Sequence, residues 1–285
     1  MSKQRHIQNL IFLNVSILLM STSGVLGRYI ALPVPVIIVS RAVIASILLV
    51  LFCKWKGIDL TIKKKDRGAV ILSGALLGIH WITYFQALKL SNVAIGMLSL
   101  FTFPVITSFL EPLLLKTKFH KIHILLGILV LTGIYYLVPE FSFESEYVKA
   151  VGYGMFSAIC YSLRNIITKK KVGGYNGSMM MFHQLLVVSV MLMPCYFFFD
   201  ISNIPDEFGN LMLLAVITTT LGHTMWMYSL QKFSATTASM ICAIQPVFGV
   251  LIGIVTVHEI PHLTTVFGGS LILISVVIES VRSSK

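Results

Sequence analysis

The chain is a succession of long apolar segments joined by short polar connections. A helix that crosses a bilayer needs about 20 apolar residues, and segments of this kind recur from end to end. Charged residues make up only 12% of the sequence, about half the share typical of a soluble domain. We therefore expect an all-α integral membrane protein. The first apolar run, Ile7 to Ile30, is too long for a signal peptide and is expected to be retained.

Charged residues and Gly, Pro and Asn positions divide the apolar segments into ten predicted transmembrane helices. These helices cover residues 8–30, 35–53, 68–88, 92–115, 122–139, 149–168, 178–199, 209–230, 235–257 and 263–281. The connections are short, so we expect no domain outside the membrane.

Positive residues are distributed unevenly between the two sides of the predicted bundle. If the ten helices alternate in direction, 17 of the 22 lysines and arginines fall on one side, and the other side has only Lys89 and Lys149. An excess of Lys and Arg marks the cytoplasmic side. Both termini are therefore predicted to be cytoplasmic, in a multi-pass protein of the bacterial inner membrane. The net charge of +11 then indicates topology and contact with anionic lipid, not nucleic-acid binding.

A repeat with an offset of 142 residues divides the chain into two halves. Ala87–Pro104 and Ser229–Pro246 each read as the end of one apolar helix, a polar turn and a second helix that contains a proline. Five helices per half is an odd number, so the second half enters the membrane in the opposite sense. We expect inverted five-helix repeats at 1–140 and 149–285, the recurring architecture of secondary transporters, whose substrate sites lie near the midplane. Pro104 and Pro246 are predicted to be flex points of two gates; static kinks are the alternative.

Several motifs occur together in the order and spacing of one transporter family. They are P-V-I-I-V-S-R-A-V-I-A with Arg41, Y-F-Q-A-L-K before Pro104, L-L-G-I-L-V-L-T-G, W-M-Y-S-L, A-T-T-A-S, Q-P-V-F, and the H-E pair that ends at Glu259. On these motifs, which span nearly the whole chain, it resembles the ten-helix EamA-type transporters of the drug/metabolite transporter superfamily. The resemblance implies a cavity between helices one to four and six to nine, with helices five and ten at the periphery.

Three features depart from the family pattern. The first half has Lys116–Lys118 where the second half has Glu259, Glu111 lies inside the fourth helix, and Arg164 lies inside the sixth. These three differences lie at positions that could determine which type of substrate is transported. The resemblance therefore defines the fold more closely than the solute.

Charged side chains inside membrane helices are costly, and their default interpretation is functional. For Arg41 we expect a scaffold role, with its side chain paired to backbone carbonyls; substrate contact is the alternative. Glu111 and Arg164 lie at similar depth and are predicted to form an ion pair or share a vestibule, where Glu111 could carry a proton. Extension to the interface is the alternative for both. Near the outer end, interface anchoring is expected for Arg28 and Glu259, with an ion pair as the alternative.

Aromatic and histidine side chains gather near the middle of the third and eighth helices, away from the interface belts. This pattern predicts a polar-aromatic cavity for flat or amphiphilic solutes; core packing with satisfied histidines is the alternative. The predicted substrate contacts are His80, Trp81, Tyr84, Tyr161, Arg164, His223, Trp226, Tyr228 and Gln245. Gly249 and Gly253 form a G-x-x-x-G motif, which predicts close helix packing within the bundle.

The sequence lacks the phosphate-binding loop of ATP-driven proteins and the H-E-x-x-H zinc motif. We therefore expect no enzyme activity, cofactor or metal. We expect a monomeric secondary transporter that exports an amino acid or related metabolite by alternating access, with or without proton coupling. The alternatives are exchange or uptake of a larger anionic or nucleotide-type metabolite, or a membrane-embedded sensor or enzyme.

Overall fold

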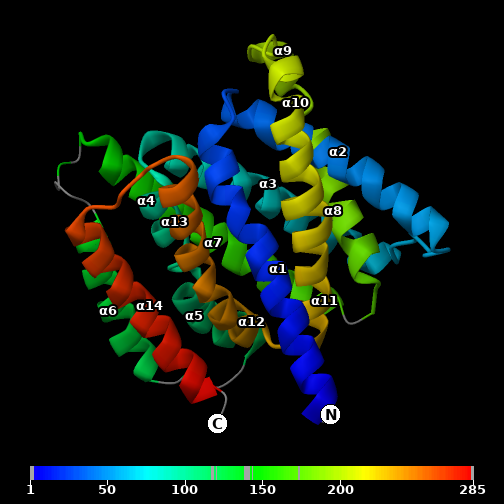
Figure 1. The fold of residues 1–285 in the computed structure, drawn as a ribbon. Helices are drawn as coiled ribbons and strands as arrows, with labels where there is room; N and C mark the ends of the chain where they lie inside the picture. Colours follow the sequence, from blue (N-terminus) through cyan, green and yellow to red (C-terminus); the bar gives the residue numbers. More distant parts are fainter. Residues whose placement is uncertain are drawn as a thin grey trace.

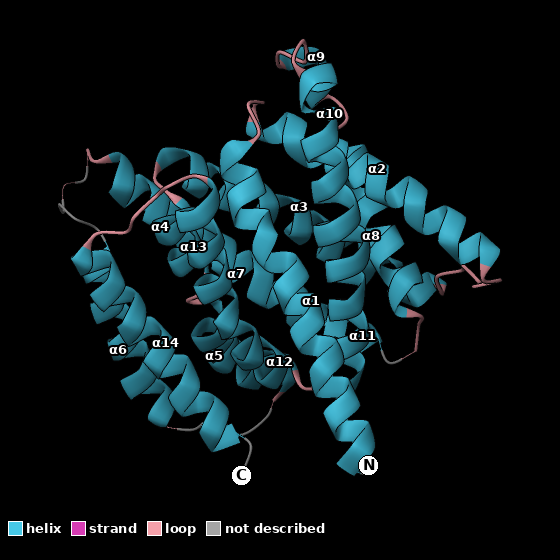
Figure 2. Cartoon of the chain, in the orientation of Figure 1, coloured by secondary structure: helices cyan, strands magenta, loops and turns pink. Residues whose placement is uncertain are grey.

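A computed structural model describes residues 3–116, 119, 121–137, 142, 144–172 and 174–283. The predicted repeat boundary at residue 140, and Thr117 and Lys118 of the Lys116–Lys118 segment, lie outside these residues. Within the described part of the chain, every regular element is helical (Figure 2). A helix satisfies its backbone hydrogen bonds within one segment, which is the requirement that lipid imposes.

The helices of the first half follow the predicted segments closely. The segment at 92–115 consists of two helices, and each of the others is a single helix. The elements are α1 (Lys3–Tyr29), α2 (Val34–Trp55), the 3₁₀ turn η1 (Lys64–Asp66), α3 (Arg67–Leu90), α4 (Val93–Leu100), α5 (Phe103–Leu115) and α6 (Ile122–Leu137).

The second half contains more interruptions. Its elements are α7 (Glu146–Val172), α8 (Gly177–Leu192), α9 (Cys195–Phe198), α10 (Ile204–Leu213), η2 (Leu214–His223), α11 (Thr224–Lys232), α12 (Ala235–Ile241), η3 (Cys242–Ile244), α13 (Gln245–Thr256) and α14 (Leu263–Ser283). The element η2 is a π-helix inserted between α10 and α11. Such wide turns are rare and occur frequently at functional sites.

Seven helices or helix runs in the described residues are long and apolar enough to cross a membrane. Two further apolar helices are shorter: α6, and the Leu263–Ile278 part of α14. The long helix α7 carries Arg164 and ends in three lysines, so its average character is less apolar. The protein is therefore a multi-pass membrane protein, and the count of ten spans remains a prediction.

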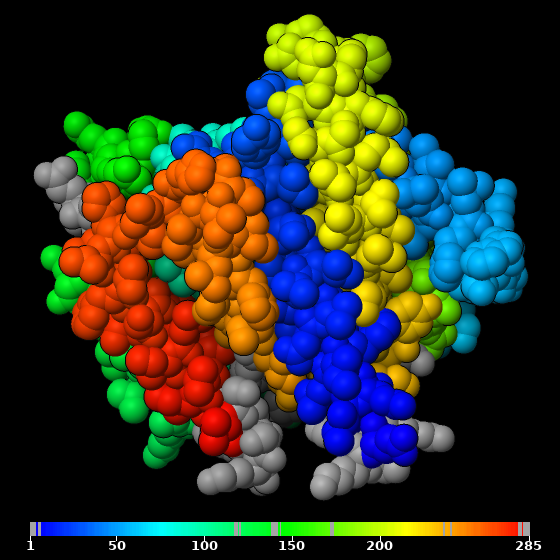
Figure 3. Space-filling model, viewed as in Figure 1, coloured from blue at the N-terminus to red at the C-terminus, as the bar shows by residue number. Residues whose placement is uncertain are grey.

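The two halves interlock rather than lying side by side. Helix α3 packs against α7, α2 against α8, and α1 against both η2 and α13. In the space-filling view, α1 (blue) runs between the η2–α11 segment (yellow) and α13 (orange) (Figure 3). Helices α6 and α14 pack on each other at one edge of the bundle (Figure 1). Most of the interior is thus formed by helices that belong to different halves.

Helix α1 begins and α14 ends at the same end of the bundle (Figure 1). We call this end the inner side and the opposite end the outer side, following the lysine and arginine bias. The loops after α1 and α13 lie on the outer side (Figure 1).

Both repeat prolines lie where a membrane helix is broken, not inside a continuous helix as predicted. Pro104 is in the first turn of α5, after a turn at Phe101 and Thr102 that ends α4. Pro246 is in the first turn of α13, directly after η3. Proline lacks an N–H group and is favoured in the first turn of a helix, where that group has no intrahelical partner. The fourth span of each half is therefore discontinuous.

The segment before each proline begins with an equivalent cap. The side chain of Asn92 accepts a hydrogen bond from the Ile95 amide over 2.9 Å. The Ser234 hydroxyl accepts one from the Thr237 amide, also over 2.9 Å. Both residues of one cap are related to those of the other by the 142-residue offset. Because a side-chain cap satisfies one of the free amides at a helix start, the two halves share local chemistry as well as layout.

Candidate functional site

A small cavity of about 30 Å³, lined by buried residues, lies between the interlocked halves. The first half contributes side chains from α1, α3 and the α4–α5 break, and the second half contributes side chains from α7, η2 and α13. A cavity of this size holds about one or two water molecules. Six of the nine predicted substrate contacts line it: His80, Trp81, Tyr84, Tyr161, His223 and Gln245.

Stacked rings form one wall of the cavity. The ring centroids of His80 and Tyr161 are 4.4 Å apart, and those of Tyr161 and Trp226 are 6.2 Å apart, with nearly parallel planes in both pairs. Phe103, next to the break in the fourth span, meets Tyr161 edge-on at 4.9 Å. The wall therefore connects α3 of the first half to α7 of the second, and Trp226 of α11 supports it by stacking on Tyr161.

The opposite wall contains a histidine from the π-helix. The His223 ring meets Trp81 edge-on, with centroids 5.3 Å apart. Two polar atoms of the lining, Tyr84 Oη and His223 Nδ1, are buried and have no hydrogen-bond partner among the described residues. Buried polar groups are normally paired, so unpaired atoms on a cavity wall mark this place as a candidate binding site.

Arg41 lies behind Trp81 and is fully buried. Its guanidinium carbon is 4.0 Å from the Trp81 ring centroid. Its Nε and Nη2 atoms donate to the Thr219 hydroxyl over 3.0 and 2.8 Å, and Nη2 also donates to the Thr218 hydroxyl over 3.2 Å. The expected backbone carbonyl partners are thus replaced by hydroxyls, because both threonines direct their own protons to the Leu214 carbonyl and keep lone pairs for the arginine.

Arg164 lies behind the stacked wall and is also fully buried. It donates from Nε and Nη2 to Gln184 Oε1 over 3.0 and 2.6 Å, and from Nη1 to Asn165 Oδ1 over 2.9 Å. The Gln184 amide nitrogen in turn donates to the hydroxyls of Ser73 and Thr168. The guanidinium is therefore held by neutral oxygens of α7 and α8.

Glu111 and Arg164 do not form the predicted ion pair, because Arg164 is held by neutral partners. Arg164 makes its hydrogen bonds within α7, to α8 and to the Met227 sulfur of α11, whereas Glu111 lies on α5 and interacts electrostatically with Lys169 at the inner end of α7. The Lys169 ammonium also donates to the Leu230 carbonyl over 2.8 Å. Similar depth along two helices did not bring the charges together, because Arg164 turns toward the interior of the α7–α8 contact.

Trp226 and Tyr228 face different parts of the protein. Trp226 donates from Nε1 to Asn165 Oδ1 over 3.3 Å and stacks on Tyr161. The Tyr228 hydroxyl instead lies 2.9 Å from Asn176 Oδ1, at the start of α8 on the inner side. Two residues along an α-helix are about 200° apart around its axis, so the two side chains cannot share a face. Tyr228 is not part of the cavity wall.

The break before α13 places Gln245 on the cavity wall beside Pro246. Its Oε1 accepts a hydrogen bond from the Cys242 thiol over 3.2 Å. On the same helix, Gly249 faces Met97 of α4, and Gly253 faces Val93 of α4. The G-x-x-x-G motif thus lies at a helix contact inside the bundle.

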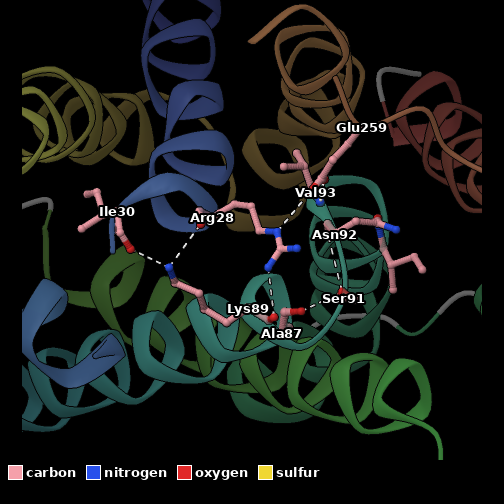
Figure 4. A network of polar contacts seen from close by, with 9 residues as sticks. Arg28, Ile30, Ala87, Lys89, Ser91, Asn92, Val93 and Glu259 are labelled. Atoms are coloured by element: carbon pink, nitrogen blue, oxygen red, sulfur yellow. Dashed lines mark hydrogen bonds and ion pairs between the residues drawn. The ribbon is translucent and has the colours of Figure 1, made fainter. Parts of the chain in front are cut away.

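A polar network joins the two halves on the outer side (Figure 4). Glu259, in the loop after α13, accepts a hydrogen bond from Arg28 Nε over 2.9 Å and, at its other oxygen, from the Val93 amide over 2.8 Å. Arg28 also donates to the Lys89 carbonyl, and the Lys89 ammonium donates to the carbonyls of Arg28 and Ile30. Interface anchoring was the expected role for Arg28 and Glu259; the alternative, an ion pair, is present.

Polar contacts of Asp66, in η1 directly before α3, also reach the end of α7 and the loop that follows it on the inner side. The Lys171 ammonium is 2.6 Å from Asp66 Oδ1, and the Tyr175 hydroxyl donates to Asp66 Oδ2 over 2.7 Å. Together with the Lys169 contact, these interactions close the inner end of the bundle. The residues that line the cavity between these two sets of contacts are all buried.

Several residues of the site were not among the predictions. Thr218 and Thr219 hold Arg41, Gln184 holds Arg164, and the Ser157 hydroxyl pairs with His80 Nδ1 over 2.7 Å. A lone glutamine in an apolar segment and consecutive threonines before His223 are visible in the sequence. Those two signals could have been noted, but small hydroxyl residues such as Ser157 are too common in membrane helices to be singled out.

The sequence profile of the EamA-like transporter family matches residues 9–138 and 148–281. These two matches correspond to the two halves described above and together cover most of the chain.

Individual proteins give more distant matches. The pseudopaline exporter CntI, found in two strains of Pseudomonas aeruginosa, is 22% identical over 245 residues, which cover 86% of this chain and 85% of the exporter. A solved structure described only as "Crystal structure of protein" superimposes with a TM-score of 0.73 at 16% identity, and covers 96% of this chain and 97% of that one. This likeness supports the fold alone.

Proposed function

The chain belongs to the EamA-like transporter family, and we propose that it is a secondary transporter that moves a small metabolite across the membrane by alternating access. We propose export of an amino acid or a related compound as its activity. The name of the CntI relatives, which are exporters, favours this direction. We further propose that the protein acts as a monomer in the bacterial inner membrane, with ten spans and both termini in the cytoplasm.

The observation that carries this proposal is the buried cavity between the two halves. Its walls come from both repeats, and it lies beside both helix breaks, at Phe103 and at Gln245. A relative movement of the halves would therefore change the shape of the cavity and open it toward one side. Discontinuous helices around a central site are a recurrent feature of transporters with inverted repeats.

The lining favours a solute with a flat or amphiphilic part. The rings of His80 and Tyr161 stack on each other in the lining, with Trp226 stacked on Tyr161 outside it, and such surfaces pack well against planar groups. The cavity as it stands is too small for a metabolite. We therefore propose that the solute binds when the cavity is open to one side, and that the two halves then close around the bound solute.

Counterflow in proteoliposomes tests the proposal directly. Vesicles loaded with an unlabelled metabolite from a panel of amino acids and their derivatives should transiently accumulate the same labelled compound from outside. Tyr161→Leu, which removes a ring from the cavity wall, should reduce the rate at least tenfold. Tyr228→Phe, which changes a tyrosine outside the cavity, should leave the counterflow rate unchanged. Absence of counterflow across the panel would favour a membrane-embedded sensor or enzyme.

Proton coupling is a separate part of the proposal. Glu111 was predicted to lie inside a span, and a carboxylate in such a position is able to carry a proton. We propose Glu111 as the coupling residue if transport depends on a pH gradient. The variant Glu111→Gln should then keep counterflow but lose the dependence on the gradient. Full retention of that dependence would exclude this role.

The second candidate function is exchange or uptake of a larger anionic metabolite. The observation that favours it is the presence of two fully buried arginines, Arg41 and Arg164, next to the cavity. Replacing unlabelled amino acids by nucleotides or sugar phosphates inside the vesicles would separate this activity from the first.

A further inference from the structure

The interior of the protein contains two positive charges with no negative partner among the described residues. Arg41 and Arg164 are fully buried, and all their hydrogen-bond partners are neutral. The ion pairs between described residues involve other cations, namely Arg28, Lys149 and Lys171. A guanidinium group stays protonated in proteins, so the centre of the bundle carries two uncompensated charges.

An uncompensated charge inside a membrane protein is expensive, and neutral hydrogen bonds offset only part of that cost. Arg41 is not fully satisfied even by neutral partners, because its Nη1 atom is buried without a hydrogen-bond partner among the described residues. A structural role alone would be served more cheaply by a neutral side chain. The arrangement therefore points to a negative charge that is supplied from outside the chain.

Both arginines lie directly behind the walls of the cavity. Arg41 stacks on Trp81 at 4.0 Å, and the guanidinium carbon of Arg164 is 5.9 Å from the ring centroid of Tyr161. Trp81 and Tyr161 both line the cavity. The fields of both guanidinium groups reach His80 and His223, which also line it. The cavity is thus the place where the two positive fields overlap.

The lining also offers unused hydrogen-bonding atoms. Tyr84 Oη carries a proton that it donates to none of the described residues, and His223 Nδ1 is unpaired as well. A carboxylate accepts hydrogen bonds at both oxygens and would satisfy the Tyr84 hydroxyl while it balances the arginine charges.

We propose that the cavity is a carboxylate site and that the transported solute carries a net negative charge at neutral pH. This inference rests on the proposed transport function and narrows its substrate class from amino acids in general to acidic metabolites and acylated or otherwise amine-blocked amino acids. Arg41 and Arg164 provide the charge, and Tyr84 donates directly to the solute. A zwitterion fits less well, because its ammonium group would enter a region that already carries two positive charges.

An engineered counter-ion tests the charge of the cavity without knowledge of the solute. Ser23 of α1 lines the cavity and is buried. Ser23→Asp places a carboxylate there, and Ser23→Asn places a neutral group of the same shape. We expect the aspartate variant to melt about 2–5 °C above the asparagine variant at pH 7.5 in detergent. A buried carboxylate ordinarily destabilises, so the sign of this difference is diagnostic.

Arginine variants identify the source of the effect. In an Arg41→Gln or Arg164→Gln background, the advantage of aspartate over asparagine at position 23 should shrink by at least half, whereas Arg41→Lys and Arg164→Lys should preserve it. If a glutamine variant does not fold, the comparison of the two Ser23 variants alone still decides the proposal. An aspartate variant that melts at or below the asparagine variant would overturn it.

A pair of matched probes tests the ligand class in the same assay. N-acetyl-L-phenylalanine is an anion, and N-acetyl-L-phenylalaninamide is its neutral counterpart. We expect a larger rise in melting temperature with the anion, and we expect Arg164→Gln to abolish the difference. An equal or smaller shift with the anion would contradict the proposal. Neither measurement requires transport, so failure of the carboxylate site and failure of the transport function can be distinguished.

Discussion

The Nε atom of Arg28, at the end of α1, lies 2.9 Å from Oε1 of Glu259, in the loop between α13 and α14. The two residues belong to different halves and are separated by 231 positions. Since the second carboxylate oxygen accepts the Val93 amide at the start of α4, one side chain connects three elements at the outer end. The carboxylate also has a favourable position at a helix N-terminus. The position equivalent to Glu259 in the first half is Thr117, which cannot supply this charge.

We predict that Glu259→Gln opens the outer side more often. Both side chains are partly exposed, so the pair is worth about 1 kcal/mol, or roughly a fivefold change in opening. A membrane-impermeant thiol reagent, added from the outer side, would measure the change in a Ser23→Cys variant that lacks Cys195. Glu146→Gln, which breaks the exposed Lys149 pair within α7, is the control and should change nothing. Equal labelling in both variants would contradict a gating role for Glu259.

The threonines of the π-helix should differ in importance. Thr219→Val removes the hydroxyl that accepts two hydrogen bonds from Arg41, and should destabilise the protein by about 2 kcal/mol because the lost bonds involve a buried charge. Thr220→Val is the matched control, since the Thr220 hydroxyl donates to the Ala215 carbonyl of its own helix. Thermal unfolding in detergent would measure both. Similar melting temperatures for the two variants would show that Arg41 does not depend on Thr219.

The two glycines of the G-x-x-x-G motif should respond differently to alanine. A Cβ atom at Gly249 would overlap Met97 Sδ, and the same sulfur lies 2.8 Å from the point where a Cβ atom would stand at Gly24 of α1. Met97 must therefore shift to admit the methyl group, and Gly24 of α1 restricts the space on its other side. Gly249→Ala should cost about 1–3 kcal/mol. At Gly253 the nearest atom is 3.4 Å away, in Val93, so Gly253→Ala should be nearly neutral in the same unfolding assay.

The prolines at the two helix breaks should affect opposite gates. Alanine at position 104 or 246 supplies an N–H group and allows the helix to continue across the break. Because the two spans run in opposite directions, Pro104→Ala should impair opening toward the inner side and Pro246→Ala opening toward the outer side. Labelling of Ser23→Cys from each side of oriented vesicles would measure this. The same change in accessibility in both variants would count against paired gates.

The positions of the helices could be predicted almost entirely from local sequence. Each of the ten apolar segments coincides with a helix or a short run of helices. The interruptions were harder to predict. Pro104 and Pro246 indicated the places, but the sequence alone did not distinguish a kink from an interruption of the α-helix by a turn or a 3₁₀ segment, because that choice depends on what packs around the freed backbone groups.

The sequence predicted that a polar-aromatic cavity exists, but it did not predict every residue that lines the cavity. The midplane clustering of His80, Trp81 and His223 indicated a cavity lining, and all three line the cavity. The same clustering on the eighth helix predicts that Tyr228 belongs to this lining, but it does not line the cavity. Its helix turns it toward Asn176 instead, and that rotation depends on packing against α8.

The partners of the charged residues were decided by tertiary structure. Arg164 was expected to meet Glu111 but is held by Gln184, and Arg41 was expected to meet carbonyls but is held by two hydroxyls. Such partners lie on other helices, often more than a hundred residues away, and the choice among them depends on the rotation of each helix about its axis.

By itself, the sequence determined the membrane class, the helical segments, the repeat and the family. Lipid forces each span to satisfy its backbone within its own segment, so these features are recorded locally in runs of apolar residues. The tertiary structure alone decided that residues of both halves line one buried cavity, that Arg28 reaches Glu259, and that the two buried arginines flank this cavity without a carboxylate partner among the described residues. Those relationships arise only when helices from both halves interlock.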